Sequence, residues 1–392
     1  MATLRAVRVT MLSWEYPPLV VGGLGRHIDA LARALAAGGT EVEVVTRGGG
    51  DVPTQETRDK VEVVRARTDE VAIEFAVESL LAWASSADHS LLRSALPRVL
   101  SQPPDVVHAH DWLVAQSAVT LAQVAGAPLV TTIHATEWGR HGGHLTTPLR
   151  RAIDSVERWL VHQSDRVIVC SIAMHDEVVA RLGADPARVD IVTGGVDITA
   201  WGGRRPPRAD APVLLFAGRV EWEKGLQDVV DGLPAIRRAF PGTTLRVAGE
   251  GSYEGGVRAL ARRRRVASAV EWLGRCDDAT LAAQYRAADV VVVPSSYEPF
   301  GLVALEAAAA GTPRVVARTG GLAEQVRDGV TGEVVPPADP AALATAVTRL
   351  LHDPARAARL AAAAKRDVRP RHGWDTVAAA TAAVYERAQV ER

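Results

Sequence analysis

Two cations follow what reads as a buried strand in the second half of the chain. The run FAGRVEWEKG places Arg219 and Lys224 five residues apart around a turn, directly ahead of an apolar helix. An arginine fork and a lysine point charge at one strand end suit a diphosphate, because both bring positive charge and N–H donors to phosphate oxygens. The competing interpretation is that they pair on the surface with Glu221 and Glu223, as mixed charges often do.

Two carboxylates lie around a helix start in the stretch PSSYEPFGLVALEAAAAGTP. Glu298 precedes the helix and Glu306 lies within it. Between them lie the backbone N–H groups of Phe300, Gly301 and Leu302. The first N–H groups of a helix have no partner inside it and can donate to ligand oxygens. Carboxylates also bind vicinal hydroxyls, as in the ribose contacts of dinucleotide folds.

The alternative is that Glu298 caps the helix and Glu306 lies on a solvated face. The alanine and glycine residues around Glu306 indicate close packing, which favours a ligand over a solvated face. A ligand with sugar hydroxyls at both ends and a diphosphate between them is a nucleotide-sugar. The second half of the chain is therefore predicted to bind one.

A glycine-rich loop, WEYPPLVVGGLGRH, opens a helix in the first half of the chain. Gly22, Gly23 and Gly25 could present backbone N–H groups to an anion at the positive end of that helix. The alternative is a tight turn that needs glycine for its shape, and one such loop does not decide between the two.

Histidines and an aspartate follow two neighbouring strands. VVHAHDW gives His108, His110 and Asp111, and TTIHATEWGRH gives His134 ahead of a loop with further basic residues. An HxH pair could be half of a metal site, but no further ligand follows at a fixed spacing, so we expect no metal. A lone histidine is more often structural than catalytic; Asp111 and His134 at adjacent strand ends favour function here.

Short β-branched runs alternating with helices must position these residues. Runs such as ADVVVVP are apolar on both faces, which is typical of parallel sheets covered by helices. We therefore predict an α/β protein of two doubly wound domains, in which ligands bind beyond the carboxyl ends of the strands. The predicted strands are 8–14, 42–46, 61–65, 105–110, 129–133, 166–170 and 190–192 in the first half, and 213–217, 244–248, 270–273, 290–294, 314–317 and 333–335 in the second.

Composition limits the function classes. The 392 residues are 47% hydrophobic with a net charge of −1, so we expect two domains and no nucleic-acid partner. Cys170 and Cys276 read as buried free thiols. The uncharged run 112–133 reads as a buried helix, a turn and a strand rather than a membrane span. With no signal peptide visible, we expect a cytoplasmic protein. The segment WGGRRPPRADAP, 201–212, reads as a linker between the halves.

Several of these motifs together resemble family 4 glycosyltransferases of the GT-B fold. EPFGLVALE, GRVEWEKG, the IHA histidine and the opening GGLG occur in the family's order over nearly the whole chain. WEYPPLVVGGLGRHI, VVHAHDWLVA and TIHATEWGRH are more similar still to actinobacterial glycogen-synthase-like α-1,4-glucosyltransferases, the group linked to glycogen and methylglucose lipopolysaccharide synthesis. The resemblance implies domains at 1–195 (acceptor side) and 196–371 (nucleotide-sugar side), with a final helix, 372–392, returning to the first.

The resemblance also implies roles for the residues in these motifs. The Gly23 N–H would contact the donor phosphate and His134 the transferred sugar, while Asp111 would line the active site. Arg219 and Lys224 would hold the diphosphate. The remaining implied contacts are Glu298 to the sugar hydroxyls, Glu306 to the ribose, and the region from Leu273 to Arg275 to the base.

The implied reaction is retaining transfer of glucose from UDP- or ADP-glucose to an α-1,4-glucan, without a cofactor or metal. Family members are usually assigned front-face attack, in which the departing phosphate accepts the acceptor's proton. The alternatives are a different family 4 transferase, a nucleotide-sugar epimerase or a non-catalytic glucan-binding relative, and the complete set of site residues argues against the last. Many relatives have Asn-Gly-Val-Asp where this chain has Gly194 and Gly195, which removes a side chain there. The Arg262–Arg265 run reads as a solvated helix face, and the oligomeric state is left open.

Overall fold

A computed structural model describes residues 6–20, 22–67, 73, 76–206 and 210–391. The chain forms two compact units, and each is described by itself. The first unit is Met1–Gly195 together with Trp374–Arg392, and the second is Val196–Gly373. The last helix of the chain thus belongs to the same unit as the first strand.

The first unit is built on an eight-stranded sheet with the order β3-β4-β2-β1-β5-β6-β7-β8. All neighbouring strands are parallel except β3 and β4, which are antiparallel. The predicted strands are present, with ends that differ by no more than one residue. Their bounds are β1 Arg8–Ser13, β2 Glu41–Arg47, β3 Gln55–Arg58, β4 Val61–Ala66, β5 Val106–His110, β6 Leu129–Ile133, β7 Arg166–Val169 and β8 Val189–Ile191.

Strand β3 is the one strand of this sheet that the sequence did not predict. Its four residues, QETR, are polar and mostly exposed. An edge strand paired on one side needs no apolar pattern, and polar residues there discourage further pairing. Periodicity therefore carries no signal for it.

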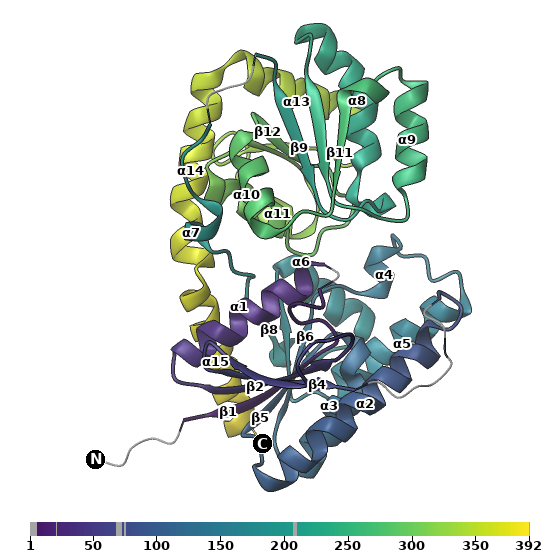
Figure 1. Ribbon diagram of the computed structural model, residues 1–392, viewed down its shortest axis with the longest axis vertical. Coiled ribbons are helices and arrows are strands. Elements are labelled where there is room, and N and C mark those ends of the chain that lie inside the picture. Colours follow the sequence, from purple (N-terminus) through teal and green to yellow (C-terminus); the bar gives the residue numbers. More distant parts are fainter. Residues whose placement is uncertain (1–5, 21, 68–72, 74–75, 207–209, 392) are drawn as a thin grey trace. The chain divides into compact units, whose positions relative to one another are not determined.

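Alternate residues of the first sheet pack into two separate cores, as the pleat requires. Val9 and Met11 of β1 face a core with α1 (Gly23–Ala37) and α15 (Trp374–Val390). Leu12 of the same strand lies on the opposite face of the sheet. It packs with α2 (Leu80–Ser101), α3 (Ala115–Ala125) and α5 (Pro148–Gln163). Figure 1 shows these helices around the lower sheet. Short helical segments complete the unit: η1 Trp112–Val114, α4 Glu137–Arg140, α6 Ile172–Glu177, η2 Val178–Leu182 and η3 Pro186–Arg188.

The second unit repeats the plan with a six-stranded, fully parallel sheet of order β11-β10-β9-β12-β13-β14. The predicted doubly wound α/β fold is confirmed. The strands are β9 Val213–Ala217, β10 Thr244–Ala248, β11 Val270–Gly274, β12 Val290–Val293, β13 Arg314–Ala317 and β14 Glu333–Val335. The helical segments are α7 Ile198–Trp201, η4 Trp222–Lys224, α8 Leu226–Ala239, α9 Glu254–Arg263, η5 Ala267–Ala269, α10 Asp278–Ala287, α11 Leu302–Ala310, α12 Gly320–Gln325, α13 Pro340–His352 and α14 Pro354–His372.

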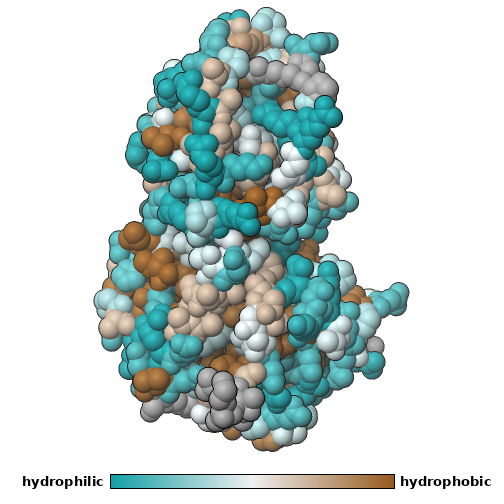
Figure 2. Space-filling model, turned by 90° about the vertical axis from the view of Figure 1, so that its left-hand side faces the viewer, coloured by the Kyte–Doolittle hydropathy of each residue, from teal (hydrophilic) through white to brown (hydrophobic). Residues whose placement is uncertain are grey.

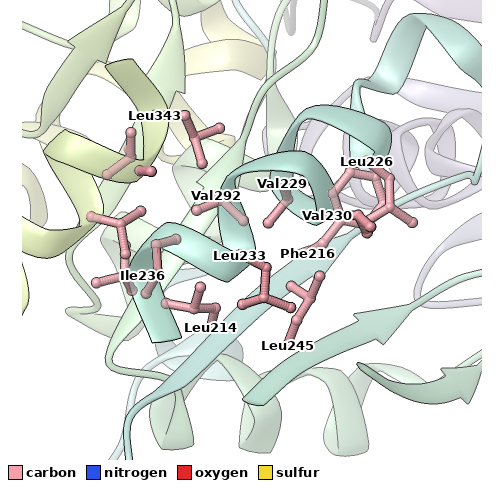
Figure 3. Close-up of a cluster of buried hydrophobic side chains, with 14 of the residues drawn as sticks. Leu214, Phe216, Leu226, Val229, Val230, Leu233, Ile236, Leu245, Val292 and Leu343 are labelled. Carbon is pink, nitrogen blue, oxygen red and sulfur yellow. The ribbon is translucent and has the colours of Figure 1, made fainter. Parts of the chain in front are cut away.

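Helix α8 supplies much of the core of the second unit. Figure 3 shows its apolar side chains turned towards side chains of β9, β10 and α13. Leu226, Val229, Val230, Leu233 and Ile236 recur at helical spacing and are all fully buried. Each such residue contributes on the order of 1.5–3 kcal/mol when buried. The core therefore fixes the start of α8, and Lys224 comes just before that start in the sequence.

The segment predicted to link the two halves instead packs within the second unit. Trp201 is buried against Tyr285, with ring centroids 5.5 Å apart. The Arg286 guanidinium donates to the Gly202 carbonyl at 3.0 Å, and Arg205 donates to the Ala288 carbonyl at 2.5 Å. The linker prediction was wrong because the boundary falls earlier, between residues 195 and 196. Residues 207–209 of the segment lie outside the described part.

Other predictions from the sequence can be compared with the structure directly. The uncharged run 112–133 forms η1, α3, a turn and β6, as expected. Cys170 is a buried free thiol, whereas Cys276 is only half-buried. Among the described residues, no helix is long and apolar enough to cross a membrane. On the face shown in Figure 2, strongly hydrophobic residues form small groups separated by hydrophilic ones.

The strand order reverses once in each sheet, between β1 and β5 and between β9 and β12. At such a point the chain leaves two adjacent strands in opposite directions, which opens a crevice at their carboxyl ends. The exit loops of these strands carry most of the residues singled out from the sequence.

Candidate active site

The exits of β9 and β12 are joined across the reversal point of the second unit. The Lys224 ammonium group donates to Glu298 Oε2 at 2.9 Å, and the Ser296 N–H donates to the Glu223 carbonyl at 2.8 Å. Gly225 is in contact with Pro294, and a β-carbon there would collide with the Pro294 carbonyl oxygen. The two loops thus hold each other in place, and Lys224 is fixed at the exits of these two strands.

Arg219 is less constrained than Lys224. Its guanidinium contacts Glu223 Oε1 at 3.2 Å, and its side chain remains 42% exposed. The surface pairing that competed with ligand binding is therefore present for Arg219. Glu221 does not join it, because its carboxylate accepts from the Ser252 N–H and hydroxyl. An exposed guanidinium paired on one side keeps N–H groups available to a phosphate.

Glu298 is hydrogen-bonded to the neighbouring loops rather than to the helix that follows. Its Oε2 accepts from Lys224 and also from the Ser295 hydroxyl at 3.2 Å. Helix α11 is capped by Gly301, and no side chain caps it. The capping alternative for Glu298 is therefore wrong.

Close packing fixes the backbone conformation at the start of α11. Gly301 has a φ of 98°, and a β-carbon there would lie 2.5 Å from Leu322 Cδ2 of α12. Gln325 of α12 donates to the Phe300 carbonyl. Within the described chain, the N–H groups of Phe300 and Gly301 donate no hydrogen bond. They are free donors at the positive end of the helix, beside Leu302, the first helical residue.

Glu306 is buried, not solvated. It is 5% exposed within a helix whose residues from Ala304 onwards are buried, and the Tyr285 hydroxyl donates to its Oε2 at 2.7 Å. The helix-face alternative is therefore wrong. A carboxylate is costly to bury without hydrogen-bond partners, and the Tyr285 hydroxyl offsets part of that cost here.

The predicted base-binding region lies at the exit of β11. Leu273 is half-buried near the end of this strand. The following Arg275 N–H approaches Glu250 Oε1 at 3.4 Å, which brings the exits of β10 and β11 together. Leu273 therefore lies beside the loop that follows the neighbouring strand.

In the first unit, the glycine loop holds a carboxylate that the sequence analysis did not single out. The Gly22 N–H donates to Glu15 Oε2 at 3.0 Å, and Glu15 is buried. A β-carbon on Gly25 would lie 3.0 Å from Val20 Cγ2, so close packing explains that glycine. Helix α1 begins at Gly23. Val21 lies outside the described residues.

Asp111 and His134 are brought together by their strands, β5 and β6. The His134 N–H donates to Asp111 Oδ1 at 2.8 Å, and the Asp111 N–H donates to the Thr132 carbonyl at 3.0 Å. Asp111 adopts a φ of 62°, which is uncommon for a residue with a side chain. Burial raises the pKa of Asp111 to about 6. Two adjacent strand exits therefore share one polar centre.

A row of four histidines runs from that centre into the unit; His108 and His110 are buried, whereas His27 and His134 are half-buried. His110 Nδ1 lies 3.1 Å from His134 Nε2, and the ring of His27 meets His134 edge-on at 5.0 Å. His108 bonds the Tyr385 hydroxyl of α15 at 2.8 Å and Thr132 at 2.7 Å. Burial lowers the pKa of His27, His108 and His134 to about 3, and lowers that of His110 well below its usual range. All four are neutral at pH 7.

Their hydrogen bonds favour one proton arrangement. Nε2 of His110 is buried and, among the described residues, has no partner. A buried N–H without an acceptor is rarer in proteins than an unused acceptor. We therefore expect the His110 proton on Nδ1, donated to His134 Nε2. His134 then carries its own proton on Nδ1, where it is a hydrogen-bond donor.

Comparison with known proteins bears on both units. The profile "Glycosyltransferase Family 4" matches residues 21–200, and "Glycosyl transferases group 1" matches residues 198–367. A "Glycogen synthase" of Mycobacterium tuberculosis is 45% identical over 391 residues, covering 97% of this chain and 94% of that protein. The chain belongs to the family 4 glycosyltransferases.

Two further relatives extend this family membership. "D-inositol 3-phosphate glycosyltransferase 2" of Catenulispora acidiphila is 35% identical, covering 97% of this chain and 95% of that protein. The solved structure of "Sucrose-phosphate synthase" from Thermosynechococcus elongatus matches with a TM-score of 0.85 and 25% identity, covering 98% of this chain and all of that one. The predicted GT-B fold and glycosyltransferase class are confirmed.

The structure groups the predicted residues of this glycosyltransferase by unit. Lys224 and Glu298 are in direct contact in the second unit, and Asp111 and His134 are in direct contact in the first. His108 and His110, considered above as half of a metal site, are instead engaged by neighbouring side chains. The run Arg262–Arg265 is exposed at the end of α9, as expected of a solvated face.

Sequence reasoning missed one further carboxyl group near this centre. Glu157 of α5 is buried, and both its oxygens accept from the Glu137 N–H at 3.0 Å. Burial raises the pKa of Glu157 to about 8, and the charge of Asp111 adds to the rise. Glu157 lies in the middle of an amphipathic helix, where nothing in its spacing marks it. Only the packing of α5 on α4 brings it to Asp111.

Proposed function

We propose that this enzyme is a retaining glucosyltransferase that moves glucose from UDP- or ADP-glucose to the non-reducing end of an α-1,4-glucan. The 45% identity to a mycobacterial glycogen synthase over nearly the whole chain carries the proposal. The site geometry supports it, because cations, free N–H groups and buried carboxylates gather at one sheet reversal. A cytoplasmic enzyme would meet such donors where cells make them.

The second unit holds the donor. Lys224 and Arg219 contact the diphosphate, assisted by the N–H groups at the start of α11. Glu306, oriented by Tyr285, accepts from the ribose hydroxyls. Leu273 lies beside the base, and Glu298 binds hydroxyls of the transferred glucose. Gly23 in the first unit donates its N–H to the phosphate.

The chemical step depends on charge rather than on a covalent nucleophile. As the glycosidic bond breaks, negative charge grows on the leaving diphosphate, and Lys224 and Arg219 are already in place to stabilise it. The phosphate oxygen then takes the proton of the attacking glucan hydroxyl on the same face. His134, neutral and with its Nδ1 proton available, donates to the sugar near the reacting carbon. Asp111 orients His134 through its backbone N–H.

A donor screen tests the proposal. The enzyme is incubated with UDP-glucose or ADP-glucose and maltotetraose in excess EDTA, and released nucleotide is measured together with product length and linkage. We expect α-1,4-elongated product with one of the donors, at a rate that EDTA does not change. Activity that EDTA abolishes and Mg²⁺ restores would contradict the metal-free mechanism.

A transferase with a small acceptor is the second candidate, supported by the 35% identity to a D-inositol 3-phosphate glycosyltransferase. The same screen separates the two when inositol 3-phosphate replaces maltotetraose. Glucosyl transfer to inositol 3-phosphate without glucan elongation would favour this candidate. Recovery of an epimerised sugar, indifferent to either acceptor, would indicate an epimerase.

A further inference from the structure

A pair of aromatic rings lies on the surface of the second unit, beside the loop that carries the two cations. Trp222 of η4 is 61% exposed. The ring of Tyr253 packs against it almost perpendicularly, with centroids 5.3 Å apart and planes at 83°. The ring of Trp272 on β11, in contrast, is covered by the Arg258 guanidinium at 4.1 Å. Trp222 is left uncovered by comparison.

The backbone under this pair is fixed by hydrogen bonds between two strand-exit loops. The Val220 N–H donates to the Glu250 carbonyl at 2.9 Å, and the Tyr253 N–H donates back to the Val220 carbonyl at 3.0 Å. The Trp222 carbonyl accepts from Gln227 at 3.0 Å. A flexible surface loop would not make this set of bonds. The two rings are therefore presented in a fixed relation.

A glycine in α9 leaves space for the Tyr253 ring, and this glycine lowers the stability of the helix. Gly256 lies in the first turn of α9, and a β-carbon there would lie 2.9 Å from Tyr253 Cε2. Glycine within a helix costs roughly 0.5–1 kcal/mol relative to alanine. Here it lets the tyrosine ring lie against the helix backbone. The position of the ring is thus built into the helix that follows it.

We propose that Trp222 and Tyr253 form a platform that binds sugar units of the acceptor α-glucan behind its growing end. This proposal rests on the proposed function. One face of a glucose ring consists of C–H groups and packs on an aromatic ring, while its hydroxyls stay in water or reach polar neighbours. Tyrosine and tryptophan combine such an apolar face with a polar tip. Glu221 and Glu254, beside the rings, are acceptors for sugar hydroxyls.

A glucan chain fits this surface better than a protein partner does. The exposed apolar area is confined to one indole ring with charged residues around it, whereas protein interfaces bury far larger areas. A carbohydrate chain needs only one or two rings per sugar contact. The platform would keep a long glucan bound between transfers, and a chain too short to reach it would gain nothing.

Trp222→Ala tests this in the full-length enzyme, with Trp159→Ala as the matched control. Trp159 is also an exposed tryptophan, 39% accessible, but it lies on α5 of the first unit. The electrophoretic mobility of each enzyme is measured in native gels containing glycogen, where binding to glycogen retards the protein. Steady-state kinetics are measured with glycogen and with maltotriose as acceptors. We expect Trp222→Ala to lose retardation and to raise the KM for glycogen by roughly 5-fold or more, as for loss of one aromatic anchor. The values for maltotriose and for the donor should not change, and Trp159→Ala should behave as wild type.

Other outcomes are distinguishable. A Trp222→Ala enzyme that is retarded like wild type overturns the platform, and one with a raised donor KM places the ring against the nucleotide instead. A change of oligomeric state on size exclusion would assign the surface to a second copy. Trp222→Phe, which keeps a ring, should retain most of the binding if Trp222→Ala folds poorly. Retardation in glycogen gels tests the platform, and transfer to maltotriose tests the proposed function. One proposal can therefore fail while the other holds.

Discussion

Lys224 provides the most direct residue-scale test of leaving-group stabilisation. Its ammonium group is held at 2.9 Å from Glu298 at the sheet reversal. Lys224→Ala should lower kcat by about 10²–10³-fold, the range for losing one preorganised charge-stabilising group. KM should change less, because the extra charge appears only as the bond breaks. Steady-state kinetics measures both. Arg264→Ala, which removes an exposed pair with Asp231, is the control, and normal turnover by Lys224→Ala would contradict the mechanism.

Asp111 gives a pH-dependent prediction at the same scale. Burial raises its pKa to about 6, above the unfolded value, so its contribution to stability is full below about pH 4 and is lost as the pH rises through 6. Asp111→Asn has no charge to bury and keeps an oxygen for the His134 N–H. Relative to wild type, its Tm should therefore rise from about pH 4 to about pH 7 and stay level above that. Asp277→Asn removes only the charge of a surface N-cap that is ionised throughout this range, so its Tm difference should stay constant. The same constancy for Asp111→Asn would refute the assignment.

At the scale of elements, α11 allows two glycines to be compared on one helix. Gly301 before it and Gly311 after it both have positive φ, at 98° and 73°. A β-carbon at Gly301 would meet Leu322 at 2.5 Å, whereas the nearest atom to one at Gly311 is 3.7 Å away. Gly301→Ala should cost about 1–3 kcal/mol of stability and most of the activity, because it displaces the free N–H groups. Gly311→Ala should cost about 1 kcal/mol and leave kcat intact. Denaturant titration and kinetics measure the two effects, and equal losses of activity would argue against a role for the helix start.

The elements also show what the sequence could predict. Strands such as β12 are apolar on both faces, so their run length and their place before a helix identify them. Residues that follow such strands, as Asp111 and Lys224 do, could be assigned to the site because strand exits converge at one edge. Tyr385 could not, since it reaches His108 from 277 residues away. The linker prediction was wrong for a similar reason. The sequence around Trp201 resembles a loop, and nothing in it reveals that Trp201 packs against Tyr285.

At the scale of the whole molecule, the two units should differ in their ability to fold alone. The second unit is continuous, while the first needs α15, which contributes five fully or nearly buried residues to its core: Val377, Ala378, Val384, Tyr385 and Ala388. The larger of these side chains are each worth roughly 1.5–3 kcal/mol, a large share of a typical 5–15 kcal/mol total. Fragment 196–373 should melt cooperatively, and fragment 1–195 should not. Circular dichroism on heating checks this, and a cooperative transition for 1–195 alone would contradict it. Adding a peptide of residues 374–391 should restore the transition.

The return of α15 also has a consequence for biosynthesis. Chains usually fold domain by domain from the N-terminus as the ribosome makes them. Here the first-made domain lacks part of its core until residues 374–390 have left the ribosome, so the second-made domain should become native earlier. Until α15 has emerged, the apolar stripe of α1, including Ile28 and Leu35, has no α15 to cover it. That stripe is a natural target for chaperones at the ribosomal exit. Proteolysis of ribosome-stalled nascent chains should find residues 196–373 protected while residues 1–195 are still cleaved.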